Sequence, residues 1–282
     1  MGIDTQCETG RTQKSSRNMI HYSEIVKLSS DYGVLNDIIE KDYCITWVLI
    51  GMGKEQFLQN IVFYGGSALK KVYFPKYRFS EDMDFLTEEK LDFENFLSCF
   101  EDVYSTILEM TNLTLTTDSQ SVEITDGRLQ FFVKYDDFSE FSKGGKVKID
   151  LFRNAELIEK PILRQIILNY SDTIDKSVEF PTYSVEALLT EKISAMTDRT
   201  EPRDLYDVWF LLKQKGIKVA KVRGYLKKKY GYEFSRSHIL PHINKPYDKL
   251  WKERLKSQIF NLPGLNIVRE ELTYYVNHFF GH

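Results

Sequence analysis

The feature that most constrains the fold of this chain is a short apolar strand that runs directly into two glycines. Residues 61–64 (Ile-Val-Phe-Tyr) are followed by Gly65 and Gly66, and a helical pattern covers residues 67–72. Glycine allows a sharp turn and a close backbone approach, and the N–H groups at a helix N-terminus attract anions. We therefore expect Gly65, Gly66 and Ser67 to bind a phosphate group, with Ser67 capping the helix.

A pair of aspartates follows this turn. Asp82 and Asp84 lie two residues apart, and apolar Phe85 follows them. Because side chains alternate along a strand, both carboxylates project from the same face. Carboxylates this close repel each other unless a cation lies between them, and Mg²⁺ prefers carboxylate and phosphate oxygens. The pair predicts a magnesium site, with two ions assisting the transfer of a nucleotide from an NTP.

Asp150 is a candidate third acid for this site. It lies on the polar face of residues 146–152, where polar and apolar residues alternate as in a strand. If this strand lies beside the one that carries Asp82 and Asp84, the three acids converge. Asp150 would then complete the metal site or accept a proton from an attacking hydroxyl.

Composition limits where the protein acts and how it meets a polyanion. The chain has 282 residues, 42% of them hydrophobic, and a net charge of -3, so a nucleic acid partner must be held by a local patch. Three scattered cysteines favour a reducing compartment and argue against zinc. The longest apolar run, residues 45–52, is too short to span a bilayer, and residues 1–18 lack an apolar signal core. We expect a cytoplasmic protein with no membrane association.

The order of the patterns predicts an α+β half followed by a helical half. We expect a flexible N-terminus over residues 1–18, a small mixed sheet flanked by helices over 19–175, and a helical domain over 176–282. Strands are expected at 61–64, 113–117, 122–125, 129–135 and 146–152. Helices are expected at 23–50, 67–72, 92–110, 184–198, 203–214, 218–229, 247–259 and 267–279. His238 and His242 have metal-ligand spacing, but Pro241 is expected to break the helix that this spacing needs.

The two motifs together resemble a known family. Gly65-Gly66-Ser67-Ala68-Leu69, followed by Arg78-x-Ser80-Glu81-Asp82-x-Asp84-Phe85, is similar to the signature of AbiEii-type nucleotidyltransferase toxins of the DNA polymerase β-like superfamily. The resemblance runs from about residue 40 to residue 212 and is weak in the last seventy residues. It implies a toxin of a toxin–antitoxin system, with a cognate antitoxin and a role in phage defence. It also implies transfer of NMP from an NTP to the 3′ end of tRNA.

The resemblance extends to the helical half through Lys192 and Asp207. It implies that Lys192 contacts a nucleotide phosphate and that Asp207 assists in the active site. Lys192 also falls in the middle of an apolar helix stripe, so it needs a phosphate or carboxylate partner unless its head reaches water. Arg78 and Ser80 are expected to bind nucleotide, although Arg78 has the alternative of balancing the nearby acids.

A basic run in the helical half has two interpretations. Lys221, Arg223, Lys227 and Lys228 form either a solvated helix face or a patch that contacts the RNA backbone. Two other functions also stay open. One is nucleotidyl transfer to a small molecule or a protein, and the other is GTP binding without turnover.

Overall fold

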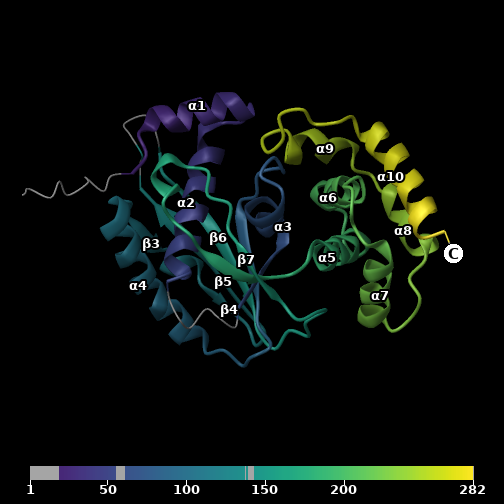
Figure 1. The fold of residues 1–282 in the computed structure, drawn as a ribbon, viewed down its shortest axis with the longest axis horizontal. Coiled ribbons are helices and arrows are strands. Elements are labelled where there is room, and N and C mark those ends of the chain that lie inside the picture. The colour runs from purple at the N-terminus through teal and green to yellow at the C-terminus, as the bar shows by residue number, and fades with distance from the viewer. Residues whose placement is uncertain (1–18, 55–60, 137, 139–142, 282) are drawn as a thin grey trace, which may run out of the picture.

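The computed structural model describes residues 19–54, 61–136, 138 and 143–281, so the predicted flexible segment 1–18 lies outside the described residues. Figure 1 shows two lobes, one built around a sheet and one built of helices. The strands are β1 (Val62–Tyr64), β2 (Asp82–Leu86), β3 (Leu115–Thr117), β4 (Glu123–Ile124), β5 (Arg128–Tyr135), β6 (Gly145–Phe152), β7 (Ile162–Gln165) and β8 (Glu179–Thr182). They form one sheet in the order β3-β5-β6-β2-β1-β8-β7, with β4 paired to β5.

The sheet is mixed, as expected. The pairs β2–β6 and β1–β8 are parallel, while β1–β2, β5–β6 and β7–β8 are antiparallel. Four of the predicted strands agree with β3 to β6 within two residues at each end. The parallel pairing of β2 with β6 matters most for function, because it brings the Asp82–Asp84 strand beside the strand of Asp150.

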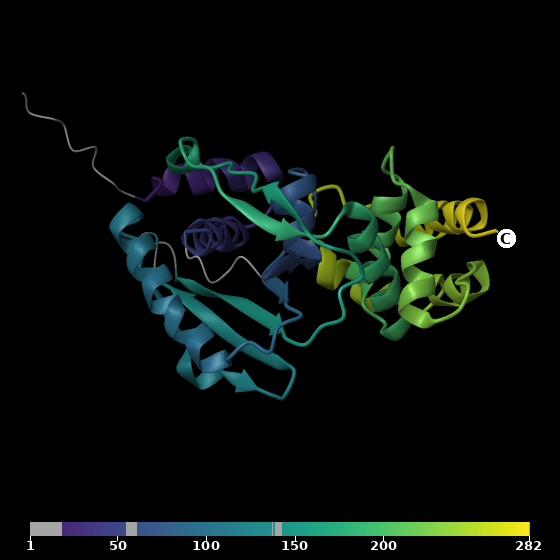
Figure 2. The same cartoon turned by 60° about the horizontal axis from the view of Figure 1, so that its bottom comes forward.

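Helices α1 (Tyr22–Tyr32), α2 (Asn36–Met52) and α4 (Phe93–Thr111) belong to the sheet lobe. The α2 helix is buried on nearly every side, and the sheet curves around it in Figure 2. The single helix predicted over residues 23–50 is in fact two helices. Gly33 ends α1 in the left-handed conformation (φ 60°), and its N–H bonds back to carbonyls of the last turn.

The sheet continues past the predicted domain boundary at residue 175. Strands β7 and β8 form an antiparallel pair, and β8 joins the sheet through Phe63 and Thr182. The helical lobe therefore begins at Val185, the first residue of α5, and the boundary moves to residues 183–184. Its helices are α5 (Val185–Asp198), α6 (Pro202–Leu212), α7 (Val219–Tyr230), α8 (Arg236–Ile243), α9 (Asp248–Leu255) and α10 (Leu265–Phe279).

Helix α8 was not predicted, because Pro241 was expected to break it. The helix instead includes Pro241 and continues to Ile243. His238 lies in its first turn, where its ring nitrogen Nδ1 accepts a hydrogen bond from the Ser235 N–H at 3.1 Å. This histidine therefore caps the helix.

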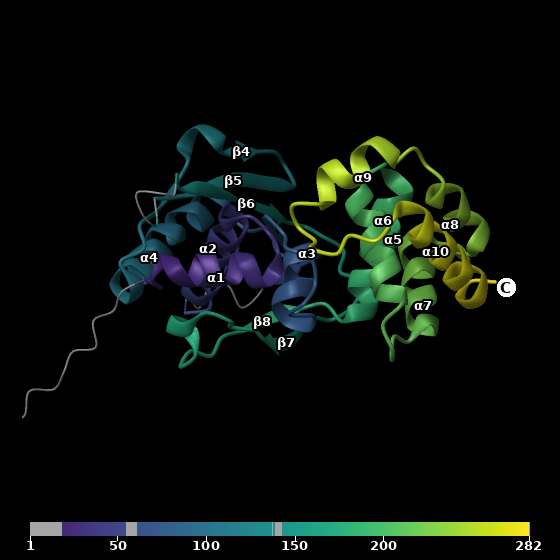
Figure 3. The ribbon, with the colours of Figure 1, turned by 90° about the horizontal axis from the view of Figure 1, so that it is seen from above.

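The segment after α9 returns to the sheet lobe. The Phe79 N–H donates to the Gln258 carbonyl at 3.2 Å, and Figure 3 shows this part of the chain reaching toward α3 (Gly65–Ala68). The C-terminal region thus contacts the loop that leads into β2. Within the described ranges, no helix is both long and apolar enough to cross a membrane.

Candidate active site

The glycine turn between β1 and α3 lies directly against one of the predicted catalytic acids. Gly65 has a φ of 78°, which side-chain-bearing residues rarely adopt. A Cβ atom on Gly65 would lie 2.2 Å from Asp84 Oδ2, and one on Gly66 would lie 2.9 Å from Ser80 Oγ. Gly65 therefore requires glycine, Gly66 leaves little room for a side chain, and the turn packs onto the residues that the sequence singled out.

Ser67 has a different local role from the one expected. It lies inside α3, whose N-cap position is Tyr64, so it does not cap the helix. Its hydroxyl is almost fully buried and donates a hydrogen bond to the backbone carbonyl of Asp82. Ser67 thus connects the glycine turn to β2, and this bond occupies the hydroxyl that was expected to meet a phosphate.

Asp82 and Asp84 project from the same side of β2, and both are partly exposed. Met83, which lies between them, and Phe85, which follows them, are buried. In the part of the chain that the structure describes, neither carboxylate has a hydrogen bond or an ion pair. Burial raises the pKa of Asp84 to about 6, and the charges of Asp82 and Asp150 add to this shift. The charges of Lys192 and Lys148 act in the opposite direction and offset this shift only in part.

Asp150 lies directly across from Asp84 in the parallel β2–β6 register. Its carboxylate is already paired with two cations. Arg128 Nε donates to Oδ1 at 2.9 Å, and Lys148 Nζ lies 2.7 Å from Oδ2. Among the described residues, no three His, Cys, Asp or Glu side chains form a group that could hold a metal ion. Asp150 is thus near the acid pair but is held by Arg128 and Lys148.

Arg128 was missed at the sequence level. It lies on β5, two residues from Gln130, which is directly opposite Asp150 in the antiparallel β5–β6 register. Residues two apart share a strand face, so Arg128 reaches Asp150 along the diagonal. The alternation of residues 128–135 predicts which side chains share a strand face with Arg128. That face can be matched to Asp150 only when the pairing of β5 with β6 is known.

Lys192 and Asp207 meet as an ion pair. Lys192 Nζ lies 2.8 Å from Asp207 Oδ2, so the lysine on the apolar stripe has the carboxylate partner that was one of its expected options. Asp207 is fully buried on α6. Burial alone would raise the pKa of Asp207, but the charges of Arg78 and Lys192 outweigh it and hold the pKa well below its usual range.

Arg78 also binds Asp207, in a two-pronged contact. Its Nε donates to Oδ1 at 2.7 Å and its Nη2 to Oδ2 at 2.8 Å, while Nη1 donates to Gln258 Oε1 at 3.0 Å. The side chain is almost fully buried. We expected Arg78 to bind triphosphate or to balance Asp82 and Asp84. It balances Asp207 instead, across the boundary between the two lobes.

A cavity of about 430 Å³ lies between the lobes and is lined by most of the predicted site residues, but not by Ser67, Asp207 or the basic residues of α7. Its sheet side is lined by the glycine turn, the acid pair and Asp150, and its helical side by Lys192, Arg199 and Arg203. Arg199 is largely exposed and donates to Asp204 at 2.6 Å. Both walls carry mixed charge, because Arg128 and Lys148 lie among the acids of the sheet side, and Glu191 and Asp198 lie among the cations of the helical side.

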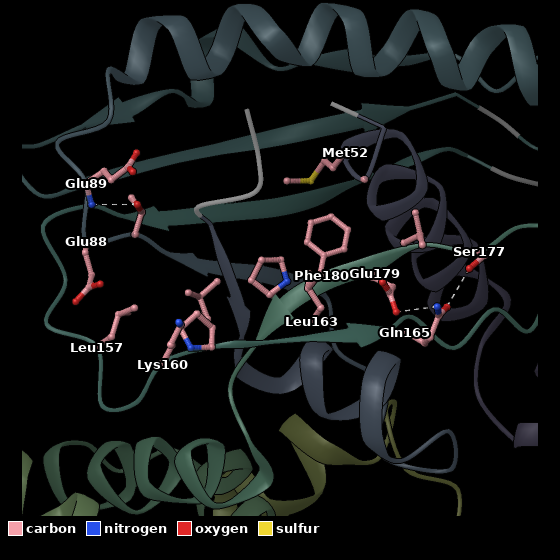
Figure 4. Close-up of a pocket in the computed structure, with 16 residues that line it drawn as sticks. Met52, Glu88, Glu89, Leu157, Lys160, Leu163, Gln165, Ser177, Glu179 and Phe180 are labelled. Carbon is pink, nitrogen blue, oxygen red and sulfur yellow. Dashed lines mark hydrogen bonds between the residues drawn. The ribbon is translucent and has the colours of Figure 1, made fainter. Parts of the chain in front are cut away.

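A larger cavity, about 840 Å³, lies elsewhere (Figure 4). It is lined by Val62 at the start of β1 and by Thr87 beyond the end of β2, which is the opposite end of these strands from the acid pair. Phe180 and Leu163 contribute apolar surface, and Glu179 accepts a hydrogen bond from Gln165 at 3.0 Å. None of the predicted site residues lines it.

The basic residues of α7, named here the α7 patch (Lys221, Arg223, Lys227 and Lys228), have mostly intramolecular partners. Lys221 pairs with Glu159 at 2.9 Å and Lys227 with Glu233 at 2.6 Å, while Lys228 Nζ donates to the Leu157 carbonyl at 2.8 Å. Their role in RNA contact stays a prediction.

The family model described as "Nucleotidyl transferase AbiEii toxin, Type IV TA system" matches residues 47–268, which include every predicted site residue. The chain belongs to this family. It is therefore a nucleotidyltransferase of the AbiEii toxin type, and membership implies an NTP substrate and an antitoxin. No curated protein matches the sequence.

Two solved structures share the fold of this AbiEii-family chain. MenT4, a nucleotidyltransferase toxin from Mycobacterium tuberculosis H37Rv, is 13% identical, with a TM-score of 0.68 over 92% of this chain and 89% of that one. A putative nucleotidyltransferase from H. pylori is 18% identical, with a TM-score of 0.55 over 86% of this chain and 93% of that one. At this identity they confirm the predicted fold class, a mixed sheet flanked by helices with a helical lobe after it.

Proposed function

We propose that this toxin transfers an NMP from an NTP to the 3′-terminal hydroxyl of tRNA and releases pyrophosphate. One observation carries the proposal. Two unpaired carboxylates, Asp82 and Asp84, lie against a glycine turn, and the ammonium group of Lys192 lines the opposite wall of the same cavity. An acid pair without direct partners and a lysine on facing sides of one cavity suit a substrate that carries both divalent cations and phosphates.

The acid pair fits a hard divalent cation. Asp82 and Asp84 offer carboxylate oxygens without other partners, and Mg²⁺ takes such oxygens together with those of a bound triphosphate. Bound there, Mg²⁺ would offset the charge of the phosphates and favour in-line displacement. Asp150, which Arg128 and Lys148 hold in place beside the pair, completes the set for a second ion in our proposal.

The residues of the chain have distinct tasks in this proposal. The backbone at Gly65, Gly66 and Ser67 approaches the triphosphate, with Ser80 beside it, and Lys192 offsets phosphate charge from the helical wall. The acceptor hydroxyl oxygen then forms a bond to the α-phosphorus, while the bond from that phosphorus to the pyrophosphate oxygen breaks. The hydroxyl proton passes to a carboxylate of the acid face, which we assign to Asp150.

The choice of tRNA comes from the family resemblance. Its physical support here is local positive charge, because the net charge of -3 gives no general attraction to nucleic acid. Arg199 and Arg203 line the cavity and are suited to acceptor phosphates. Modification of the tRNA 3′ end would stop translation. A cytoplasmic toxin held in check by its antitoxin, acting in phage defence, fits this outcome.

The test is to incubate the protein with Mg²⁺, each α-³²P-labelled NTP and separate pools of tRNA, protein and aminoglycoside. We expect label on tRNA, and we expect it to disappear when the tRNA 3′ end is first oxidised with periodate, which destroys the acceptor hydroxyls. Label on protein alone, or on the small molecule alone, would overturn the tRNA assignment.

A growth assay separates chemistry from simple binding. The Asp82→Ala variant removes one carboxylate of the acid pair and should no longer arrest growth if transfer is the cause of toxicity. Full growth arrest by Asp82→Ala, at the same protein level as wild type, would instead support a nucleotide-binding module that acts without turnover.

A further inference from the structure

Asp207 is at the centre of a buried ionic cluster that joins the two lobes. Its Oδ1 accepts from Arg78 Nε at 2.7 Å, and its Oδ2 accepts from Arg78 Nη2 and Lys192 Nζ, both at 2.8 Å. Arg78 comes from the loop before β2, Lys192 from α5 and Asp207 from α6. Both carboxylate oxygens are therefore already engaged by cations from two different parts of the fold.

The members of this cluster differ in their access to the cavity. The Asp207 side chain is 0% exposed and that of Arg78 is 3% exposed, whereas that of Lys192 is 12% exposed. Lys192 lines the cavity, and Asp207 does not. A carboxylate with no exposed surface and two cationic partners has neither the access nor the free oxygens to bind a substrate or a metal ion.

Arg78 extends the cluster to the glycine turn. A Cβ atom on Gly66 would lie 3.1 Å from Arg78 Nη2, so the guanidinium packs against the turn itself. A continuous series of contacts thus runs from Gly66 through Arg78 and Asp207 to Lys192. These contacts connect the two sides of the cavity that are suited to phosphate. A two-pronged arginine–carboxylate contact fixes orientation as well as distance.

We propose that Asp207 is a positioning residue that acts through Lys192. Its carboxylate docks α6 onto the glycine turn by means of Arg78, and the same carboxylate holds the ammonium group of Lys192 at the cavity wall. The inference rests on the proposed function in one respect, namely that Lys192 meets the NTP phosphates. It removes Asp207 from the groups that touch substrate and adds a docking role to Arg78, which also lines the cavity.

A double-mutant cycle tests this role. The affinity of the full-length protein for an α,β-methylene NTP analogue is measured by calorimetry with Mg²⁺, for wild type, Lys192→Met, Asp207→Asn and the double variant. We expect each single change to weaken binding by about tenfold, and the double variant to be no weaker than the weaker single variant. Weakening of about a hundredfold in the double variant would show independent contributions and overturn the proposal.

A matched control addresses general destabilisation. Asp42 forms another buried ion pair, with Lys71 at 2.6 Å, away from the cavity. Asp42→Asn therefore also leaves a buried cation without its carboxylate, and it should lower thermal stability while changing analogue affinity by less than about twofold. If Asp42→Asn weakens binding as much as Asp207→Asn does, the effect of Asp207 is not specific positioning.

A second cycle covers the case in which Asp207→Asn does not fold. Arg78→Gln breaks the same cluster from the sheet lobe, and its effect on analogue affinity should also disappear in a Lys192→Met background. Additive effects in this cycle would overturn the proposal. The outcomes are separable from the proposed function: a wild-type protein that binds no NTP refutes the function, whereas additive cycles in a protein that binds NTP refute only the positioning role.

Discussion

Gly65 and Asp84 are in such close contact that the turn has no room for a side chain, because a Cβ atom on Gly65 would lie 2.2 Å from Asp84 Oδ2. The left-handed backbone at Gly65 adds a second reason for glycine at this position. The glycine turn and the acid pair are therefore built as one unit, and a change in either should disturb the other.

Gly65→Ala should nearly abolish nucleotidyl transfer. The new methyl group must displace the Asp84 carboxylate or the turn, and the positive φ adds strain of about 1–2 kcal/mol. We expect a loss of at least about a hundredfold in kcat/KM, which is about 2.7 kcal/mol. Gly224→Ala is the matched control, because a Cβ atom at this exposed α7 position meets nothing within 4 Å. It should keep full activity and gain about 0.5–1 kcal/mol of stability. Full activity in Gly65→Ala would contradict the described contact.

Asp84→Asn should stabilise the metal-free protein at neutral pH while it inactivates the enzyme. The folded-state pKa of Asp84 is about 6, raised from 3.8, so the folded protein holds a proton that the unfolded chain releases. The contribution of this bound proton to the free energy of unfolding is fully present below about pH 4 and is lost as pH rises to about 6. At pH 7.5 the ionised Asp84 lowers the free energy of unfolding by about 2–3 kcal/mol. Thermal unfolding in EDTA should show Asp84→Asn to be more stable than wild type at pH 7.5 and nearly equal to it at pH 4. An equal difference at both pH values would refute the raised pKa.

Arg128→Ala should lower turnover by about tenfold with little change in NTP affinity. Removal of the guanidinium leaves Asp150 held by Lys148 alone, so the carboxylate loses its fixed orientation beside Asp84. Arg128→Lys should recover only part of the loss, because an ammonium group does not reproduce the guanidinium contacts. Steady-state kinetics with separate kcat and KM values would measure this. Arg153→Ala removes an arginine bonded to the Leu91 carbonyl, outside the cavity, and should keep wild-type kcat.

The acceptor should depend more on Arg199 and Arg203 than on the α7 patch. Both arginines line the cavity, whereas none of the α7 patch residues does. Arg199→Ala with Arg203→Ala should weaken tRNA binding and reduce the salt dependence of the affinity by about one unit of slope per lost phosphate contact. Alanine substitution of the whole α7 patch should have the smaller effect on that slope. The reverse ranking, measured by filter binding across salt concentrations, would place the RNA on α7.

The central arrangement of the site was predictable from local patterns. Alternation placed Asp82 and Asp84 on one face, and the apolar–polar pattern around Asp150 indicated a strand. Whether that strand lies beside the acid pair was left open, and the β2–β6 register shows that it does. Lys192 was predicted to need an anionic partner because it interrupts an apolar helix stripe, and Asp207 is that partner. In each case the physical rule acts over a few residues of sequence.

The remaining features depend on contacts between distant segments. Arg128 reaches Asp150 only through the β5–β6 register, and Arg78 reaches Asp207 across 129 positions of sequence. Strand β8 was not predicted, and its pairing with β1 is limited to the register of Thr182 with Phe63. Gly33 was available as a helix stop and was overlooked, because the apolar spacing on its two sides fits one continuous helix.

The connection at residues 183–184 separates the three acids Asp82, Asp84 and Asp150, which precede it, from Lys192, which follows it. Neither fragment on its own carries a complete set of catalytic groups, so a cell that makes only one of them should grow normally. Attaching each fragment to one half of a drug-inducible dimer would turn the toxin into a conditional reporter, in which growth arrest signals that the two halves have come together.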